Sequence, residues 1–134
     1  MKELIVIIFM LFSIQVKAQS EQQADSLTDQ VYTYVDKMPE FPGGNDKIQV
    51  FLKKNIVYPP LARSKKIEGR VYIGFIVDKS GRIKDVSIKR SADPVLDAEA
   101  VRVVNKMPLW KPGIQNGTPV NVSLMMPVEF KLEN

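Results

Sequence analysis

The sequence predicts an α+β domain in which two or three helices lie on one face of an antiparallel sheet. In the stretch from Thr118 to Leu132, every even position from Val120 onward carries an apolar side chain, a period of two that is typical of a long strand with one buried face. Apolar residues also alternate from Arg70 to Asp78, where a turn sequence follows at once. Between these strands, apolar residues at positions 93 to 107 recur at helical spacing. The predicted order is helix, strand, strand, helix, strand.

The first eighteen residues have the pattern of a secretory signal peptide. Lys2 precedes the apolar run Leu4–Phe12, and Val16 and Ala18 occupy the small-residue positions before a cleavage point. We therefore predict cleavage after Ala18 and export of the remaining chain. The alternative is an uncleaved membrane anchor, but the apolar run is shorter than the roughly 20 residues that a spanning helix needs.

Composition excludes several classes of function. The chain has 134 residues, 45% of them hydrophobic and 25% charged, which suits one globular domain. It contains no cysteine and no histidine, so disulfides, thiol nucleophiles, histidine triads and the usual zinc sites are excluded. The carboxylates Asp93, Asp97 and Glu99 fall in the first turns of one predicted helix, where capping explains them better than acid–base chemistry. We therefore predict a binding protein with no enzymatic activity, cofactor or metal.

Residues 19–44 are predicted to form a leader in front of the domain. Gln19–Gln30 is polar, acidic and free of aromatic residues, which is typical of a flexible segment. Val31–Val35 is a brief β-prone run, and Met38–Gly44 holds two prolines and two glycines that allow no regular element. The domain itself is expected to span residues 45–134.

Two helices are expected at the start of the domain. The first has one apolar stripe, formed by Ile48, Phe51, Leu52 and Ile56. Gly44 or Asn45 can cap its beginning. The prolines of Tyr58–Pro60 end this helix and begin a shorter one, with Pro60 in its first turn and Gly69 as its C-terminal stop.

The middle of the domain is predicted to be a hairpin followed by a helix. Asp78–Gly81 has the composition of a hairpin turn, and the returning strand runs through Val86 and Ile88. Ile83 has the opposite parity, which predicts a bulge near residues 84–85.

The last predicted helix begins at Asp93, which is followed by Pro94 in the usual pairing of cap and first residue. Pro108 ends this helix, and a loop returns the chain to the terminal strand. Trp110 lies in that loop, and we interpret this lone tryptophan as part of the core rather than as a ligand contact.

The terminal strand is predicted to lie at an edge of the sheet. Pro119 and Pro127 both occupy odd positions, and residues of one parity point their backbone N–H groups toward the same neighbour. A proline has no N–H, so that side of the strand is not expected to be fully paired within the sheet. An edge strand is a place where another chain can add a strand.

Basic residues gather around the two short helices, namely Lys53, Lys54, Arg63, Lys65, Lys66 and Arg70. No aromatic stacking platform accompanies them. We interpret them as a solvated face rather than as a nucleic-acid site.

The stretch from Tyr58 to Leu132 resembles the C-terminal domain of TonB, the envelope protein that energises outer-membrane transporters in Gram-negative bacteria. The resemblance is carried by Tyr58 and Pro59 with Ala62, Ile67 to Val71 including Gly69, Asp78 with Gly81, Leu96 and Asp97 with Ala100, Trp110 to Pro112, Gly117 with Pro119 and Val120, and Pro127 with Phe130 and Leu132. Pro39–Gly44 is also similar to the segment that precedes this domain in one branch of the family.

The resemblance implies a three-stranded antiparallel sheet with two helices, and a function in binding. In that family the terminal strand pairs with the TonB box, a short N-terminal peptide of the transporter. For this chain it implies a peptide-binding edge at Asn121, Ser123 and Met125, bounded by Pro119 and Pro127. The expected partner is a TonB-dependent outer-membrane transporter, with no nucleic acid, and the expected location is the periplasm.

The chain departs from a full TonB at its N-terminus. A full TonB has a membrane anchor, which engages inner-membrane motor proteins, and a long proline-rich linker. Only if residues 1–18 are retained would the motor proteins be partners here and the inner membrane the location. The alternative function is an envelope interaction module, or a binder of anionic cell wall, that is not coupled to the proton gradient. A homodimer through the same edge is a further possibility.

Overall fold

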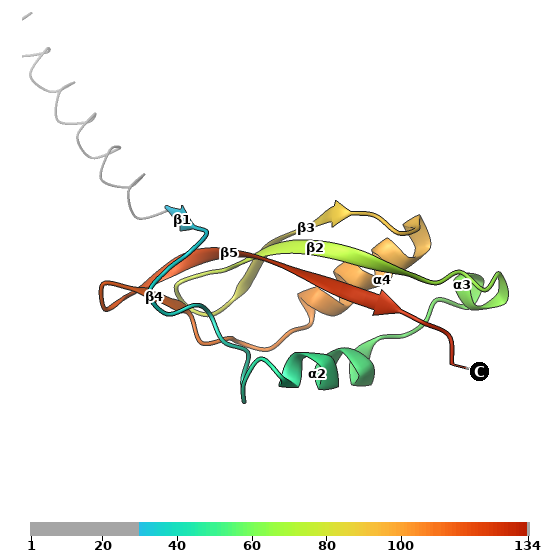
Figure 1. Ribbon diagram of the computed structural model, residues 1–134, viewed down its shortest axis with the longest axis horizontal. Coiled ribbons are helices and arrows are strands. Elements are labelled where there is room, and N and C mark those ends of the chain that lie inside the picture. The colour runs from blue at the N-terminus through green and yellow to red at the C-terminus, as the bar shows by residue number, and fades with distance from the viewer. Residues whose placement is uncertain (1–29, 134) are drawn as a thin grey trace, which may run out of the picture. The chain divides into compact units, whose positions relative to one another are not determined.

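The computed structural model describes residues 30–133, so the predicted signal peptide and most of the predicted flexible segment lie outside the described residues. Val31 is the first residue of the folded unit. Its elements are β1 (Val31–Tyr32), α2 (Lys47–Asn55), α3 (Pro60–Ser64), β2 (Gly69–Val77), β3 (Ile83–Arg90), α4 (Pro94–Asn105), β4 (Gly113–Gln115) and β5 (Thr118–Phe130) (Figure 1). Within the described part, no helix has the length and apolar character to cross a membrane.

The sheet has the strand order β1-β5-β2-β3, and β4 pairs with β5 in addition. β2 is antiparallel to both of its neighbours, and its ladder with β5 runs from Gly69 opposite Phe130 to Val77 opposite Val122. These three strands are the antiparallel sheet that the sequence predicts. β1 lies within the predicted β-prone run Val31–Val35, but its parallel pairing with β5 was not predicted. β4, which forms a hairpin with β5, is an addition that the sequence analysis does not predict.

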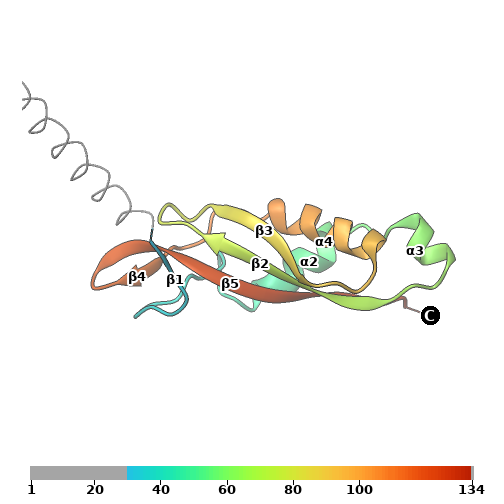
Figure 2. The ribbon, with the colours of Figure 1, turned by 90° about the horizontal axis from the view of Figure 1, so that it is seen from above.

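The core lies between the sheet and the helices. The buried side chains include Val71, Ile73, Phe75 and Val77 from β2, Val128 and Phe130 from β5, Leu96, Ala100, Val103 and Val104 from α4, and Leu52 from α2. α2 and α4 lie along the same face of the sheet (Figure 2). The opposite face carries the outward residues of β2 and β5 and is covered by no described helix, as the α+β prediction requires.

Two predicted helix boundaries are wrong. α3 ends at Ser64, and Gly69 is the first residue of β2 rather than a helix stop. Gly69 is needed for packing, because a Cβ there would lie 2.8 Å from the Cβ of Ala92. Asn45 does not cap α2 but accepts a hydrogen bond from the Phe41 N–H at 2.9 Å.

The local signals around β3 and α4 are confirmed. The register between β2 and β3 shifts between Gly74 and Ile76, and Asp85 on the opposite strand has φ 51°, which is the predicted bulge. Asp93 caps α4, since its Oδ1 accepts the Val95 N–H at 3.0 Å, and a proline follows it as the first helical residue.

Residues 35–41 pack against β4 and the chain that leads into it. Lys37 and Ile114 exchange two backbone hydrogen bonds, at 3.0 and 2.8 Å, and Glu40 and Lys111 do the same. Val35 is buried next to Gly113 of β4. The described part of the predicted leader is therefore held on the domain.

Candidate peptide-binding edge

β5 presents its two faces to different surroundings. The even residues Val122, Val128 and Phe130 are buried, and Leu124 and Met126 pack against the same core. The odd residues lie on the uncovered face, where Met125 is 64% exposed. The predicted period of two is therefore confirmed, with the predicted parity.

The outer edge of β5, meaning the side opposite β2, is defined by a proline. Pro127 lies opposite Tyr72 within the continuous β2–β5 ladder. A proline fits inside such a ladder only where its nitrogen points away from the partner strand. Its neighbours of the same parity, Ser123, Met125 and Glu129, therefore direct their N–H and C=O groups toward the outer edge.

All five predicted edge residues lie on β5, but they differ in which part of the chain pairs with them. Pro119 lies opposite Ile114 in the β4–β5 hairpin, and Asn121 lies opposite Val31 of β1. The side chain of Asn121 also accepts the Lys79 N–H at 2.9 Å. In contrast, Ser123, Met125 and Pro127 lie beyond β1, where no strand of the described chain pairs with the outer edge. The continuous open stretch runs from Ser123 to Phe130.

The β4–β5 hairpin had a local signal in the sequence. Asn116 and Gly117, with φ values of 51° and 75°, form its two-residue turn. Asparagine followed by glycine is typical of such turns, because both residues tolerate positive φ. The pair falls in the predicted return loop, and β4 is therefore not among the predicted strands.

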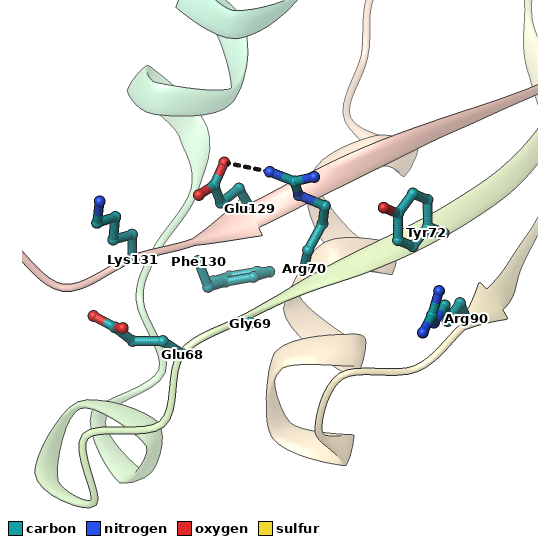
Figure 3. Close-up of a pocket in the computed structure, with 8 residues that line it drawn as sticks. All are labelled: Glu68, Gly69, Arg70, Tyr72, Arg90, Glu129, Phe130 and Lys131. Carbon is teal, nitrogen blue, oxygen red and sulfur yellow. Dashed lines mark hydrogen bonds and ion pairs between the residues drawn. The ribbon is translucent and has the colours of Figure 1, made fainter.

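A cavity of about 580 Å³ opens where β2 begins and β5 ends (Figure 3). Arg70 and Glu129 lie across it as an ion pair at 3.3 Å, with both side chains about half exposed. Hydrogen bonds to Tyr72 and to Glu129 raise the pKa of Arg70 above its ordinary value. Both acidic and basic side chains line this cavity, so charge of neither sign dominates its electrostatic potential.

The family-motif residues are structural. The Tyr58 hydroxyl donates to the Ile67 carbonyl, and its ring meets the edge of Phe130 at 5.9 Å. Gly81 has φ 89°, and a Cβ there would lie 2.1 Å from the carbonyl oxygen of Trp110. Trp110 is buried, as predicted, with its ring against Phe41 and Phe75. Pro59 precedes α3, Pro112 is half-buried before β4, and Gly69 lies against α4. None of them lies on the outer edge.

The three carboxylates of α4 also have structural roles, although only Asp93 is a cap. Asp97 accepts hydrogen bonds from Ser91 and Ala92. Glu99 is 9% exposed, accepts the Val57 N–H at 2.7 Å and pairs with Arg102 at 2.6 Å.

Burial raises the pKa of Glu99, but the hydrogen bonds from Arg102 and from the Val57 N–H outweigh burial and lower it. Glu99 thus ties the segment after α2 to α4. No cluster of acidic side chains able to hold a metal occurs in residues 30–133.

The six basic residues around the two short helices do not gather around a common binding site. All six residues are exposed. Arg63 lies over the Tyr58 ring at 5.2 Å, and Arg70 pairs with Glu129.

The fold and the edge define a small α+β domain whose terminal strand belongs both to the core and to an edge of the sheet. The family model for the Gram-negative bacterial TonB protein C-terminal matches residues 54–132. The chain therefore belongs to the TonB C-terminal domain family, as its motifs led us to expect.

Known proteins of this family share both sequence and fold with the chain. It is 35% identical over 79 residues to Protein TonB of Vibrio cholerae serotype O1, which covers 57% of this chain and 31% of that relative. The match thus spans about a third of the relative. Two NMR solution structures of the Helicobacter pylori TonB-CTD, each 21% identical, share the fold with TM-scores of 0.51 and 0.50 over 66% of this chain and 80% and 94% of theirs.

Proposed function

We propose that this domain binds the TonB-box peptide of an outer-membrane transporter by strand addition to the outer edge of β5. The observation that carries the proposal is the stretch from Ser123 to Phe130, which no described strand pairs on that side. In this role the chain would act in the periplasm and support energy-dependent transport across the outer membrane. Its membership of the TonB C-terminal domain family supports the proposal.

The edge provides both hydrogen bonds and contact area. Ser123, Met125 and Glu129 direct N–H groups outward, while Pro127 offers only a carbonyl. Each new backbone hydrogen bond contributes about 0.5–1.5 kcal/mol net. Met125 and Pro127 are exposed on the uncovered face, where alternate side chains of an added strand would contact them.

A titration of the isotope-labelled protein with a TonB-box peptide tests the proposal. We expect the largest amide shifts from Ser123 to Glu129 and small shifts in α4, which lies across the core. A peptide of the same composition with a proline at its centre is the control, because it cannot donate along a ladder. Shifts that are absent from β5, or equal with both peptides, would overturn strand addition.

A pair of variants at Met125 isolates the backbone contribution. Met125→Ala and Met125→Pro both remove the exposed side chain, but only the proline removes an outward N–H. We expect Met125→Pro to bind the peptide about 10-fold more weakly than Met125→Ala, from the loss of about one hydrogen bond. Urea unfolding of both variants checks that the β2–β5 ladder is kept. Equal affinities would contradict the outward orientation.

Two measurements separate this function from the alternatives. Binding that falls steeply with salt and shows no preference for strand-forming peptides would indicate a binder of anionic cell wall instead. N-terminal sequencing of the exported protein decides the coupling. A first residue Gln19 fits a free periplasmic protein, whereas a retained Met1 in the inner-membrane fraction fits an energy transducer.

A further inference from the structure

The chain's own β1 occupies the beginning of the outer edge of β5. Val31 lies opposite Asn121 and Tyr32 opposite Val122, in parallel orientation (Figure 1). The open part of the edge begins at the next residue, Ser123. β1 lies outside residues 54–132, which the family model matches, so it is an addition to the part shared with the family.

β1 is short and partly exposed, whereas the chain that follows it makes several contacts with the domain. The strand has only two residues, Val31 is 43% exposed, and Tyr34 is 82% exposed. From Val35 onward the chain is fixed. Val35 is buried, and Asp36 exchanges hydrogen bonds with the β4–β5 turn, donating its N–H to Gln115 and accepting that of Asn116.

The contacts that this following chain makes with the domain thus begin at Val35, and Thr33 and Tyr34 form the segment that links β1 to it. Rotation about the backbone of Thr33 and Tyr34, which lie between β1 and the buried Val35, would move β1 away from the sheet edge. Such a rotation would leave the contacts of Val35 and the core in place, since no side chain of the core cluster comes from β1.

We propose that β1 is a detachable strap that competes with the partner peptide for the outer edge of β5 at Asn121. This inference rests on the proposed function, since it concerns regulation of the same edge. A peptide that pairs only from Ser123 onward binds beside the docked strap. A longer strand that reaches Asn121 binds only when the strap has left, so its apparent dissociation constant is divided by the fraction of molecules with the strap detached.

The absence of cysteine from the chain makes a clean test possible. Val31→Cys and Asn121→Cys place two thiols on adjacent strands, about 4.8 Å apart in the backbone, which is within the range that a disulfide spans. The probe is a nine-residue TonB-box peptide, long enough to pair from Asn121 to Glu129. We expect the oxidised double variant to bind it at least about 10-fold more weakly than the same protein after reduction.

A second variant acts in the opposite direction. The double substitution Val31→Gly and Tyr32→Gly lowers the strand propensity of the strap without touching β5. We expect it to bind the nine-residue peptide about 3- to 10-fold more tightly than the wild type. A peptide that pairs only from Ser123 to Glu129 is the control, and its affinity should be the same in all forms.

The outcomes separate the strap from the proposed function. Failure of the two cysteines to form a disulfide would overturn the pairing of β1 with β5. Equal binding of the long peptide by the oxidised and reduced forms would overturn competition and leave strand addition standing. Binding of neither peptide by any form would overturn the proposed function, and the strap with it.

Discussion

Asp78→Asn tests whether one buried carboxylate holds the turn between β2 and β3. Asp78 is 6% exposed. Its Oδ1 accepts the N–H groups of Ser80 and Arg82 at 2.9 Å and the Ser80 hydroxyl at 2.6 Å, and its Oδ2 lies 3.4 Å from Lys84 Nζ. Asparagine keeps one carbonyl acceptor but removes the charge that strengthens these hydrogen bonds.

The pKa of Asp78 sets the size of the effect. Burial raises this pKa, but the hydrogen bonds from Ser80, Arg82 and Lys84 outweigh burial and lower it from 3.8 to about 2. At 1.36 kcal/mol per pKa unit, the ionised group contributes about 2.5 kcal/mol to the free energy of unfolding. Because the folded pKa is the lower one, this contribution is complete above pH 5 and is lost as the pH falls toward 2. About half of it remains at pH 3.

Urea unfolding followed by the emission of Trp110 measures this difference, since Trp110 is the only tryptophan and is 5% exposed. We expect Asp78→Asn to lower the free energy of unfolding by about 2 kcal/mol at pH 7 and by about half as much at pH 3. Asp85→Asn, on an exposed carboxylate of the same hairpin, is the matched control and should change little. A deficit that is the same at pH 7 and pH 3 would refute the electrostatic explanation.

Two further substitutions test the hydrogen bonds of Glu99 in the core and the direction of the backbone N–H groups along the outer edge of β5. Glu99→Ala leaves the Val57 N–H and the guanidinium of Arg102 without their acceptor, and we expect urea unfolding to show a loss of about 2–4 kcal/mol; a change below about 0.5 kcal/mol would contradict this tie. Pro127→Ala adds an outward N–H, and we expect about 2- to 10-fold tighter peptide binding and more self-association in sedimentation, with Pro119→Ala as the control. No change in either measurement would show that Pro127 does not limit the edge.

The elements that follow from short-range signals were predicted well. The Asp93–Pro94 pair begins α4 because a cap and a proline act within one turn, and the parity change at Ile83 shows the bulge within three residues. The alternation along β5 needed no partner to be recognised, since it reflects one buried face. The even side chains of β5 accordingly turn to the core.

The parts that depend on distant contacts were not predictable in the same way. The run Val31–Val35 was recognised as β-prone, but its partner is Asn121, ninety positions further along the chain in the register of β1 and β5. The need for glycine at position 69 comes from the Cβ of Ala92, which no local pattern shows. The edge prolines indicated which side of β5 is open, but not that the chain covers the start of that side.

The arrangement of β5 would allow the proposed binding edge to be used without weakening the domain. Its ladder with β2 and its buried side chains Val128 and Phe130 fix the strand on one side and one face. These contacts hold the outer edge in place, and a strand added there would not replace them. An added strand would make β5 a central strand of the sheet, with β2 and the core unchanged. Only β1 would have to move, and it contributes nothing to the core. The proposed peptide binding and the stability of the domain are therefore separable in this fold, because the residues assigned to them alternate along β5.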